Sequence, residues 1–188
     1  IFLLSLYLQK VKGLSPRDAG SILVAQPIVM ALFSPVTGRL SDKIQPRYLA
    51  TIGMTMCTIG LAAFAFLTEK TPTGLIVFLL FWVGTGFAFF SSPNMNTIMS
   101  SVQKNQLGLA SGSASTMRVV GQITSMTIAT LFFAVLFDKH AVEAVANPLF
   151  LKALKLGFIT FAIISVAGIY FSFKRGQLTR EYEGRRKS

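Results

Sequence analysis

The sequence predicts an all-α membrane protein with one truncated helix and five full transmembrane spans. The first observation is composition, because 52% of the 188 residues are hydrophobic and 13% are charged, whereas soluble domains are about one quarter charged. The second is the placement of the charges. A helix needs about 20 apolar residues to cross the hydrocarbon core of a bilayer. Five stretches of about this length or more contain no charged residue, namely 19–38, 48–68, 71–103, 119–137 and 156–173.

Each element follows from these stretches and from the helix breakers between them. Residues 1–9, "IFLLSLYLQ", are apolar but too short to span, so we interpret them as the last part of a cut helix. Turn-rich links are predicted at "GLSP", "EKTPTG" and "QKNQLG", with a longer one at 138–148. The full spans are predicted at 18–38, 47–68, 74–101, 107–137 and 149–173. Residues 1–173 therefore form a helical bundle, and residues 174–188 form a basic tail.

Basic residues predict the orientation of the chain in a cell membrane. The predicted bundle has two ends, and the basic tail leaves from one of them. More of the 18 Lys and Arg residues lie at that end than at the opposite end. Because cytoplasmic loops carry the excess of positive charge, we expect a multi-pass plasma-membrane protein with a cytoplasmic tail. The net charge of +11 does not indicate nucleic-acid binding, because no basic cluster is interleaved with aromatic residues on a soluble module. Attraction of the basic tail to anionic lipid head groups accounts for the positive charge.

The clearest polar pattern within a span lies in residues 107–137. Spacings of three and four place five polar residues on one face of the predicted helix: Ser111, Ser115, Arg118, Gln122 and Ser125. A polar face on a membrane helix must contact protein or water. Arg118 and Gln122 are therefore candidates for a substrate cavity. The alternative is that Arg118 binds carbonyl groups or reaches the interface and holds two helices together.

Small residues and helix breakers mark the other candidate positions. Gly108 and Gly112 form a G-x-x-x-G pair, and Gly84, Ala88 and Ser92 recur every four residues, as expected for close helix packing. Pro93 interrupts the hydrogen bonding of its helix. Interrupted helices at membrane depth are typical of transporter binding sites. Amides beside prolines are therefore candidates either for ligand contact or for helix–helix hydrogen bonds: Gln26, Asn94 and Asn96.

The sequence offers no basis for enzyme chemistry, a metal or a cofactor. Cys57 has no partner for an internal disulfide, and His140 has no nearby partners with metal-ligand spacing. No nucleophile elbow or phosphate-binding loop is present. No aspartate or glutamate lies deep within a predicted span. A carboxylate that couples transport to protons or sodium is therefore expected elsewhere in the protein.

A charged segment between the first two full spans carries a family resemblance. The spacing Gly38-x-Leu40-x-Asp42-Lys43-x-x-x-Arg47 resembles the G-x-L-x-D-[RK]-x-G-x-[RK] loop of the major facilitator superfamily, with Gln45 in place of the second glycine. In that family the loop joins the second and third helices of a six-helix half on the cytoplasmic side. Residues 6–20, "LYLQKVKGLSPRDAG", are similar to the start of the C-terminal half of fourteen-helix drug exporters.

The resemblance implies secondary active transport, with protons exchanged for hydrophobic or amphipathic small molecules. The partners are then the bilayer, an N-terminal half of the same transporter, the substrate and protons. An uptake symporter, or a sensor or accessory component that moves nothing, remains an alternative. Gly38 is expected to end its helix and Pro46 to begin the next, with Asp42 near the positive end of that second helix. We expect five residues to form a cytoplasmic gating loop: Gly38, Arg39, Asp42, Lys43 and Arg47.

Overall fold

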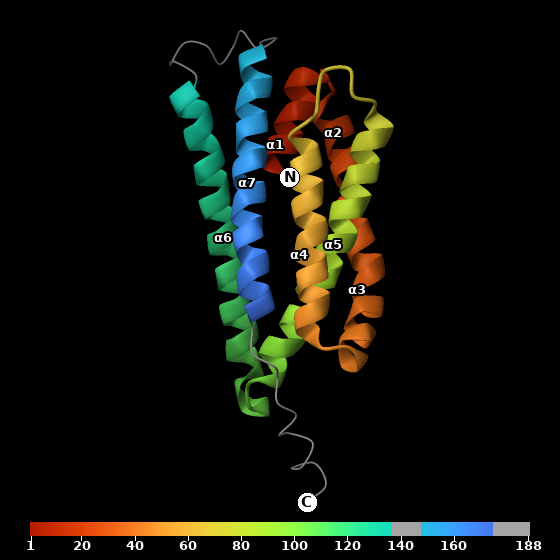
Figure 1. Ribbon diagram of the computed structural model, residues 1–188, viewed down its shortest axis with the longest axis vertical. Helices are drawn as coiled ribbons and strands as arrows, with labels where there is room; N and C mark the ends of the chain where they lie inside the picture. The colour runs from red at the N-terminus through yellow and green to blue at the C-terminus, as the bar shows by residue number, and fades with distance from the viewer. Residues whose placement is uncertain (137–147, 175–188) are drawn as a thin grey trace, which may run out of the picture.

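The computed structural model describes residues 1–136 and 148–174, which are helical apart from short links (Figure 1). The helices are α1 (Phe2–Leu6), η1 (Tyr7–Val11), α2 (Pro16–Leu23), α3 (Ala25–Lys43), α4 (Pro46–Phe64), α5 (Thr73–Ser100), η2 (Lys104–Gln106), α6 (Leu107–Leu136) and α7 (Pro148–Lys174). With α2 and α3 counted as one, five are long and apolar enough to cross a membrane. The all-α prediction is confirmed for the described residues. The 138–148 link, apart from Pro148, and the tail beyond Lys174 lie outside them.

The first full span is built from two helices, α2 and α3. Ser15 caps α2, because its side-chain oxygen accepts a hydrogen bond from the Asp18 backbone N–H at 3.2 Å, and Pro16 takes the first helical position. The two helices meet at Val24. Pro27 lies in the first turn of α3, where its missing N–H removes a bond to the turn before. The sequence-predicted interruption beside Gln26 is therefore present at the α2–α3 junction.

The structure corrects the expected helix end at Gly38. The helix α3 continues five residues further to Lys43, and Gly38 does not have a positive φ. Arg39 and Asp42 therefore lie in the last turns of α3 rather than in a loop. The link to α4 is only Ile44 and Gln45. Pro46 takes the first position of α4 as predicted.

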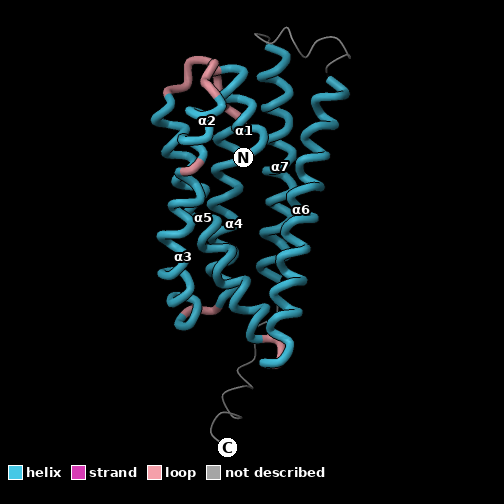
Figure 2. The backbone as a smooth tube through the Cα atoms, turned by 180° about the vertical axis from the view of Figure 1, so that it is seen from behind, coloured by secondary structure: helices cyan, strands magenta, loops and turns pink. Residues whose placement is uncertain are grey.

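The long helices run alternately up and down, with α3, α5 and α7 descending in Figure 1 and α4 and α6 ascending. Helix α5 packs against both α3 and α4, and α4 packs in turn against α7. Helix α6 stands at the edge of the bundle beside α7, which is also clear from behind in Figure 2. In lipid, such contacts are stabilised by close van der Waals packing rather than by the hydrophobic effect.

Glycine permits the closest helix contact, which lies between α4 and α5. A Cβ atom added to Gly53 would lie 2.5 Å from the Gly86 carbonyl oxygen and 2.5 Å from the Phe90 nitrogen. A Cβ atom on Gly86 would lie 3.0 Å from the Gly53 oxygen. The two backbones are therefore in direct contact, which only residues without a side chain allow.

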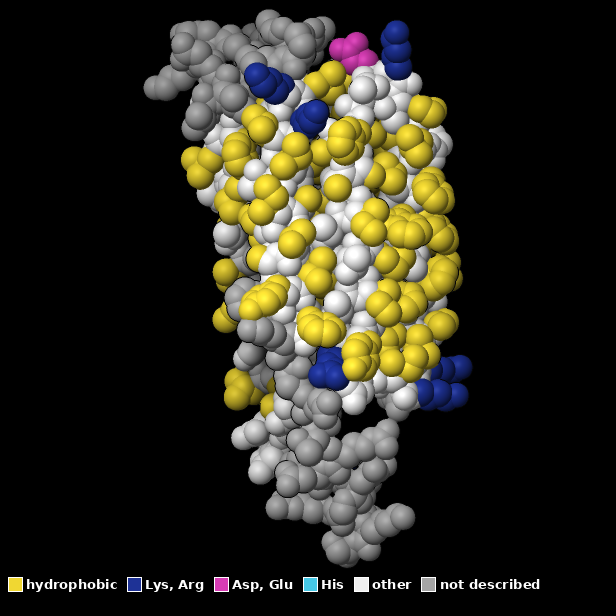
Figure 3. Space-filling model, viewed as in Figure 1, with side chains coloured by type: hydrophobic (Ala, Val, Ile, Leu, Met, Phe, Trp, Pro, Cys, Tyr) yellow, Lys and Arg dark blue, Asp and Glu magenta, His cyan; other side chains and the backbone are white. Residues whose placement is uncertain are grey.

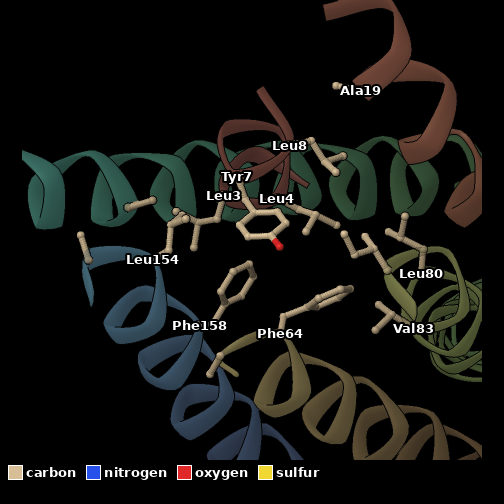
Figure 4. Packing of buried hydrophobic residues seen from close by; sticks show 14 of the residues in the cluster. Leu3, Leu4, Tyr7, Leu8, Ala19, Phe64, Leu80, Val83, Leu154 and Phe158 are labelled. Atoms are coloured by element: carbon tan, nitrogen blue, oxygen red, sulfur yellow. The ribbon is translucent and has the colours of Figure 1, made fainter. Parts of the chain in front are cut away.

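The short N-terminal helix is a buried part of this bundle rather than an appendage. Leu3, Leu4, Tyr7 and Leu8 are buried, and they point toward residues of α4, α5 and α7 (Figure 4). The ring centroid of Phe64 in α4 lies 5.6 Å from that of Phe158 in α7, closing the same cluster. The segment before α2 therefore fixes the relative positions of three long helices at one end.

A single π-turn, η1, directs two polar side chains of this segment to the α4–α5 link. The Lys12 N–H bonds to the Tyr7 carbonyl at 3.1 Å, which places one extra residue in the turn. The Tyr7 hydroxyl donates to the Thr68 carbonyl at 2.7 Å, and Lys12 Nζ donates to the Glu69 carbonyl at 2.6 Å. Gly13 follows with φ of 65°, a left-handed conformation that glycine adopts without strain.

Deletion of Lys10 should lower stability, because it removes the extra residue that defines the π-turn. The segment then returns to α-helical spacing, and Tyr7 and Lys12 no longer reach successive carbonyls together. The loss of one to two hydrogen bonds is worth about 1–3 kcal/mol. The substitution Lys10→Ala keeps the length and serves as the control, because Lys10 is exposed. Thermal unfolding of the detergent-solubilised protein measures the difference, and equal midpoints for the two variants would show that the π-turn has no structural importance.

Candidate functional site

The polar face of α6 is exposed along most of the helix. Arg118 and Gln122 are both exposed, and an α-helical rise of about 1.5 Å per residue places Arg118 roughly 16 Å from the start of α6, near mid-membrane depth. Among the described residues, nothing lies within 4 Å of a Cβ atom added to Gly108 or Gly112. The G-x-x-x-G pair therefore has no packing partner in this part of the chain.

Helix α6 is held mainly at its two ends. Near its C-terminal end Ala129 is buried, and the Phe133 ring centroid lies 5.4 Å from that of Phe150 in α7. At the opposite end it follows directly on η2 and the end of α5. Between these points Ser115, Arg118 and Gln122 are exposed, as are several large apolar residues, whereas Ser111 and Ser125 are half-buried. An exposed arginine at this depth requires a polar environment.

The second group of candidates lies where α3 crosses α5. A Cβ atom on Gly84 would lie 2.8 Å from the Gln26 carbonyl oxygen, and Ala88 is fully buried. The Thr37 hydroxyl, also fully buried, donates to the Ala88 carbonyl at 3.1 Å. Gly84 and Ala88 thus lie in a close helix contact, and Gln26 contributes its backbone to that contact. Thr37 was not among the residues selected from the sequence, because one threonine in an apolar span has no distinctive spacing.

Asn94 and Asn96 follow Pro93 on α5 but do not share a face. Positions two residues apart differ by about 200° around an α-helix. Asn94 is half-buried, whereas Asn96 Nδ2 donates to the Ser41 hydroxyl of α3 at 2.8 Å. Gly84, which contacts Gln26, precedes Asn96 by twelve positions, or about 18 Å along α5. The structure therefore does not bring Gln26 and Asn96 together.

A polar pocket of about 560 Å³ occupies the end of the bundle where α3 and α5 finish and α4 begins. It combines one residue of the predicted gating loop, Gly38, with one of the predicted cavity, Asn96. The full lining is Gly38, Ser41, Pro46, Asn96, Thr97, Met99 and Ser100. The α3–α4 connection and the end of α5 therefore form one structural unit.

The basic residues of the charged segment surround this end without entering the pocket lining. Arg39 and Lys43 are exposed. Arg47 lies over the Tyr48 ring, 4.6 Å from its centroid, and donates to the Tyr48 hydroxyl at 2.7 Å, while its Nε atom is buried and unpaired among the described residues. The side chain of Asp42 lies outside the described residues. Its backbone belongs to the last turn of α3, where the helix dipole is negative rather than positive.

Two hydroxyl pairs form further polar contacts within the spans, between α4 and α7. Thr58 donates to Ser165 Oγ at 2.7 Å, and Thr51 lies 3.4 Å from Ser172 Oγ. Sequence reasoning did not select them, although both pairs repeat at seven residues, which could have served as a signal. Each such bond contributes about 0.6 kcal/mol in a membrane. They fix α7 against α4.

Apart from Arg118, the charged side chains of the described residues lie toward the two ends of the bundle. Figure 3 shows an apolar band between Lys and Arg side chains at both ends. Among the described residues, no three His, Cys, Asp or Glu side chains gather as metal ligands. Asp18 in the first turn of α2 and Glu69 in the α4–α5 link also lie at span ends. The described spans thus present amides, hydroxyls and one arginine to any solute.

Comparison with known proteins agrees with this architecture. The chain matches the model of the Major Facilitator Superfamily over residues 1–126. It is 34% identical to the riboflavin transporter RibZ of Clostridioides difficile, over 72% of this chain and 29% of that protein. It is 26% identical to the multidrug resistance protein Stp of Mycobacterium tuberculosis, over 79% of this chain and 28% of that protein. It is 29% identical to a tetracycline resistance determinant of Streptomyces rimosus, over 71% of this chain and 38% of that protein.

The similarity to these relatives covers only part of each of their sequences. The chain spans well under half the length of each of these relatives. No solved structure matches it. The five span-length helices and the family match over two thirds of the chain lead to one conclusion: the chain belongs to the Major Facilitator Superfamily of membrane transporters and is not an enzyme.

Proposed function

We propose that the chain is the C-terminal six-helix half of a secondary active transporter that exports hydrophobic or amphipathic small molecules in exchange for protons. The observation that carries this proposal is the exposed polar face of α6, with Arg118 near mid-membrane depth. Such a face needs water or protein beside it. A solute pathway between this half and an N-terminal half places both water and protein beside this face of α6.

The rest of the bundle supports a division between a lipid-facing side and a pathway-facing side. Large apolar residues are exposed at every fourth position from the α2–α3 junction along α3: Val24, Ile28, Leu32 and Val36. Such a ridge suits contact with lipid tails. Helix α6 also exposes large apolar residues, but one of its faces exposes serine, arginine and glutamine side chains. In the proposed transporter, α6 therefore borders the pathway and α3 presents its ridge to lipid.

The class of substrate rests on relatives whose names state multidrug resistance and tetracycline resistance. A pathway lined by hydroxyls, amides and apolar side chains suits amphipathic solutes. The described spans contain no deep carboxylate. In this proposal, the proton-binding carboxylate therefore belongs to the N-terminal half. The tail and the Gly38–Arg47 region face the cytoplasm of a plasma-membrane protein.

A second candidate function is transport of an aromatic vitamin, including uptake. The 34% identity to a protein named as a riboflavin transporter favours it. Riboflavin is itself a planar ring system with a polar side chain, so the same kind of pathway would accept it. The two candidates differ in substrate and direction rather than in fold.

Transport assays on the full-length protein in proteoliposomes separate the candidates. With an imposed proton gradient, we expect movement of a lipophilic cationic dye and of tetracycline against their gradients, and loss of that movement when a protonophore is added. Riboflavin movement without dye or tetracycline movement would replace the proposal by the second candidate. No movement of any of the three compounds in vesicles that contain folded protein would exclude this substrate class.

A further inference from the structure

A lysine and an aromatic ring meet on the surface where α4 and α7 lie side by side, at the end of the bundle opposite the polar pocket. Lys155 Nζ in α7 lies over the Phe66 ring, 5.5 Å from its centroid, just beyond the C-terminal end of α4. Phe66 is 74% exposed, so the ring packs against little else in the described part of the chain. The cation–π contact therefore holds an ammonium group at a defined place on the surface.

Lys152 adds a second positive charge one turn closer to the start of α7. Residues three positions apart lie on the same face of an α-helix, so the two lysines are neighbours. Both are exposed, and neither forms an ion pair among the described residues. The carboxylates at this end of the bundle, Asp18 and Glu69, belong to α2 and to the α4–α5 link. The described part of the chain thus places two positive charges together without a counter-ion.

Apolar side chains continue from this basic pair toward the middle of the bundle. On α7, Ile159 and Ile163 follow Lys155 at steps of four, and on α4, Ile59 lies two turns before Phe66. All three isoleucines are exposed. Figure 3 views this face and shows apolar side chains below the basic side chains at the upper end of α7. One continuous surface therefore carries positive charge at its end and apolar groups along its length.

These two features select a ligand with a negative head and an apolar body. A soluble anion gains nothing from the isoleucines, and an uncharged lipid gains nothing from the lysines. A zwitterionic head group brings a positive charge of its own toward the basic pair, which offsets the attraction of its phosphate. A phospholipid with a net negative head group matches both parts of the surface.

We infer that Phe66, Lys152 and Lys155 form a binding site for an anionic phospholipid on the α4–α7 surface. The phosphate lies beside the two ammonium groups, and an acyl chain follows Ile159 and Ile163 along α7. Both lysines fall within the first eight residues of α7, so their long side chains reach the head-group region at this end of the apolar band. The inference does not depend on the substrate, the direction of transport or the orientation of the chain.

Fluorescence quenching by brominated lipids measures which lipid occupies this surface. Ile159→Cys is introduced into full-length protein without its other cysteines and labelled with bimane. The protein is reconstituted with mixtures of phosphatidylglycerol and phosphatidylcholine of identical chains, one of them brominated. Phosphatidylglycerol should bind about tenfold more tightly or better, since each basic residue at a membrane surface attracts an anionic lipid by about a factor of five. Equal affinity for the two lipids overturns the inference.

Ile28→Cys on α3 is the matched control for the labelled position. Ile28 is exposed, and it lies twelve residues from the start of its span, whereas Ile159 lies eleven residues from the start of α7. The two labels therefore sample similar depths of the bilayer beside different helices. A relative affinity near one is expected at Ile28, and a preference as strong as that at Ile159 would show general attraction of the protein for anionic lipid, which contradicts a site.

Charge substitutions test whether the basic pair is responsible. Lys152→Gln combined with Lys155→Gln should bring the relative affinity at the α7 label close to one. Arg17→Gln combined with Lys70→Gln removes the same net charge from exposed positions on α2 and in the α4–α5 link, and should leave the preference unchanged. Lys155→Arg should retain it, because arginine keeps the charge and stacks on Phe66. Equal losses from the two double variants would refute the site.

Two further results would assign the surface to another occupant. No quenching by either lipid, in protein that is folded, would show that a polypeptide segment covers the α4–α7 surface. A preference removed by sodium phosphate, but not by sodium chloride of equal ionic strength, would assign the lysines to a soluble anion. Either result overturns the inference, whereas a preference that persists equally in both salts supports the lipid site.

Discussion

Gly53→Ala is expected to destabilise the bundle more than any other single methyl group added to a glycine of the described spans. The new Cβ atom would meet three backbone atoms of α5 at 2.5–2.8 Å, including the Gly86 oxygen and the Phe90 nitrogen. Backbone atoms cannot rotate away as a side chain can, so α4 and α5 must separate. Overpacking of this kind costs about 1–3 kcal/mol.

Thermal unfolding followed by fluorescence-detected size exclusion measures this loss, and a fall of several degrees in the midpoint is expected. Gly121→Ala is the matched control, because no atom lies within 4 Å of a Cβ atom at that position of α6. An unchanged midpoint for Gly53→Ala would mean that the two backbones are farther apart than the structure shows.

Arg118→Ala is expected to reduce transport at least tenfold while the protein remains folded and abundant in the membrane. The side chain is exposed in this half, so its removal leaves no cavity among the described residues. Its loss removes the one formal charge of α6, and with it the polar group best placed to contact a solute at mid-membrane depth.

Arg118→Lys and Thr116→Ala complete the experiment. Lysine keeps the charge but not the planar guanidinium, so an intermediate transport rate is expected. Thr116 lies about 160° from Arg118 around α6, and its hydroxyl bonds to the Gly112 carbonyl, so its substitution should leave transport unchanged. If Arg118→Ala instead abolishes insertion or lowers the melting midpoint as strongly as Gly53→Ala, Arg118 is a structural residue that holds helices together.

The sequence alone determined the fold class and the number of membrane-length helices. Both depend on the length of charge-free stretches, a one-dimensional property set by the thickness of the bilayer. It also identified Pro46 as a helix start and the region beside Gln26–Pro27 as an interruption, because proline acts through its own backbone. The family resemblance at Gly38–Arg47 likewise required only residue order, and the family match agrees with it.

Only the tertiary structure decided which small residues form close contacts and which polar residues meet. The G-x-x-x-G pair at Gly108 and Gly112 has the expected spacing yet faces no described neighbour, whereas Gly53 and Gly86, which form no such pair, bring α4 and α5 into contact. Local spacing defines a helix face but not the helix that lies against it. Gly38 did not end α3, because the helix continues for five more residues before Ile44. Asn96 likewise meets Ser41, 55 positions earlier in the chain, because α3 and α5 run in the same direction side by side, and only that arrangement creates the pocket between them.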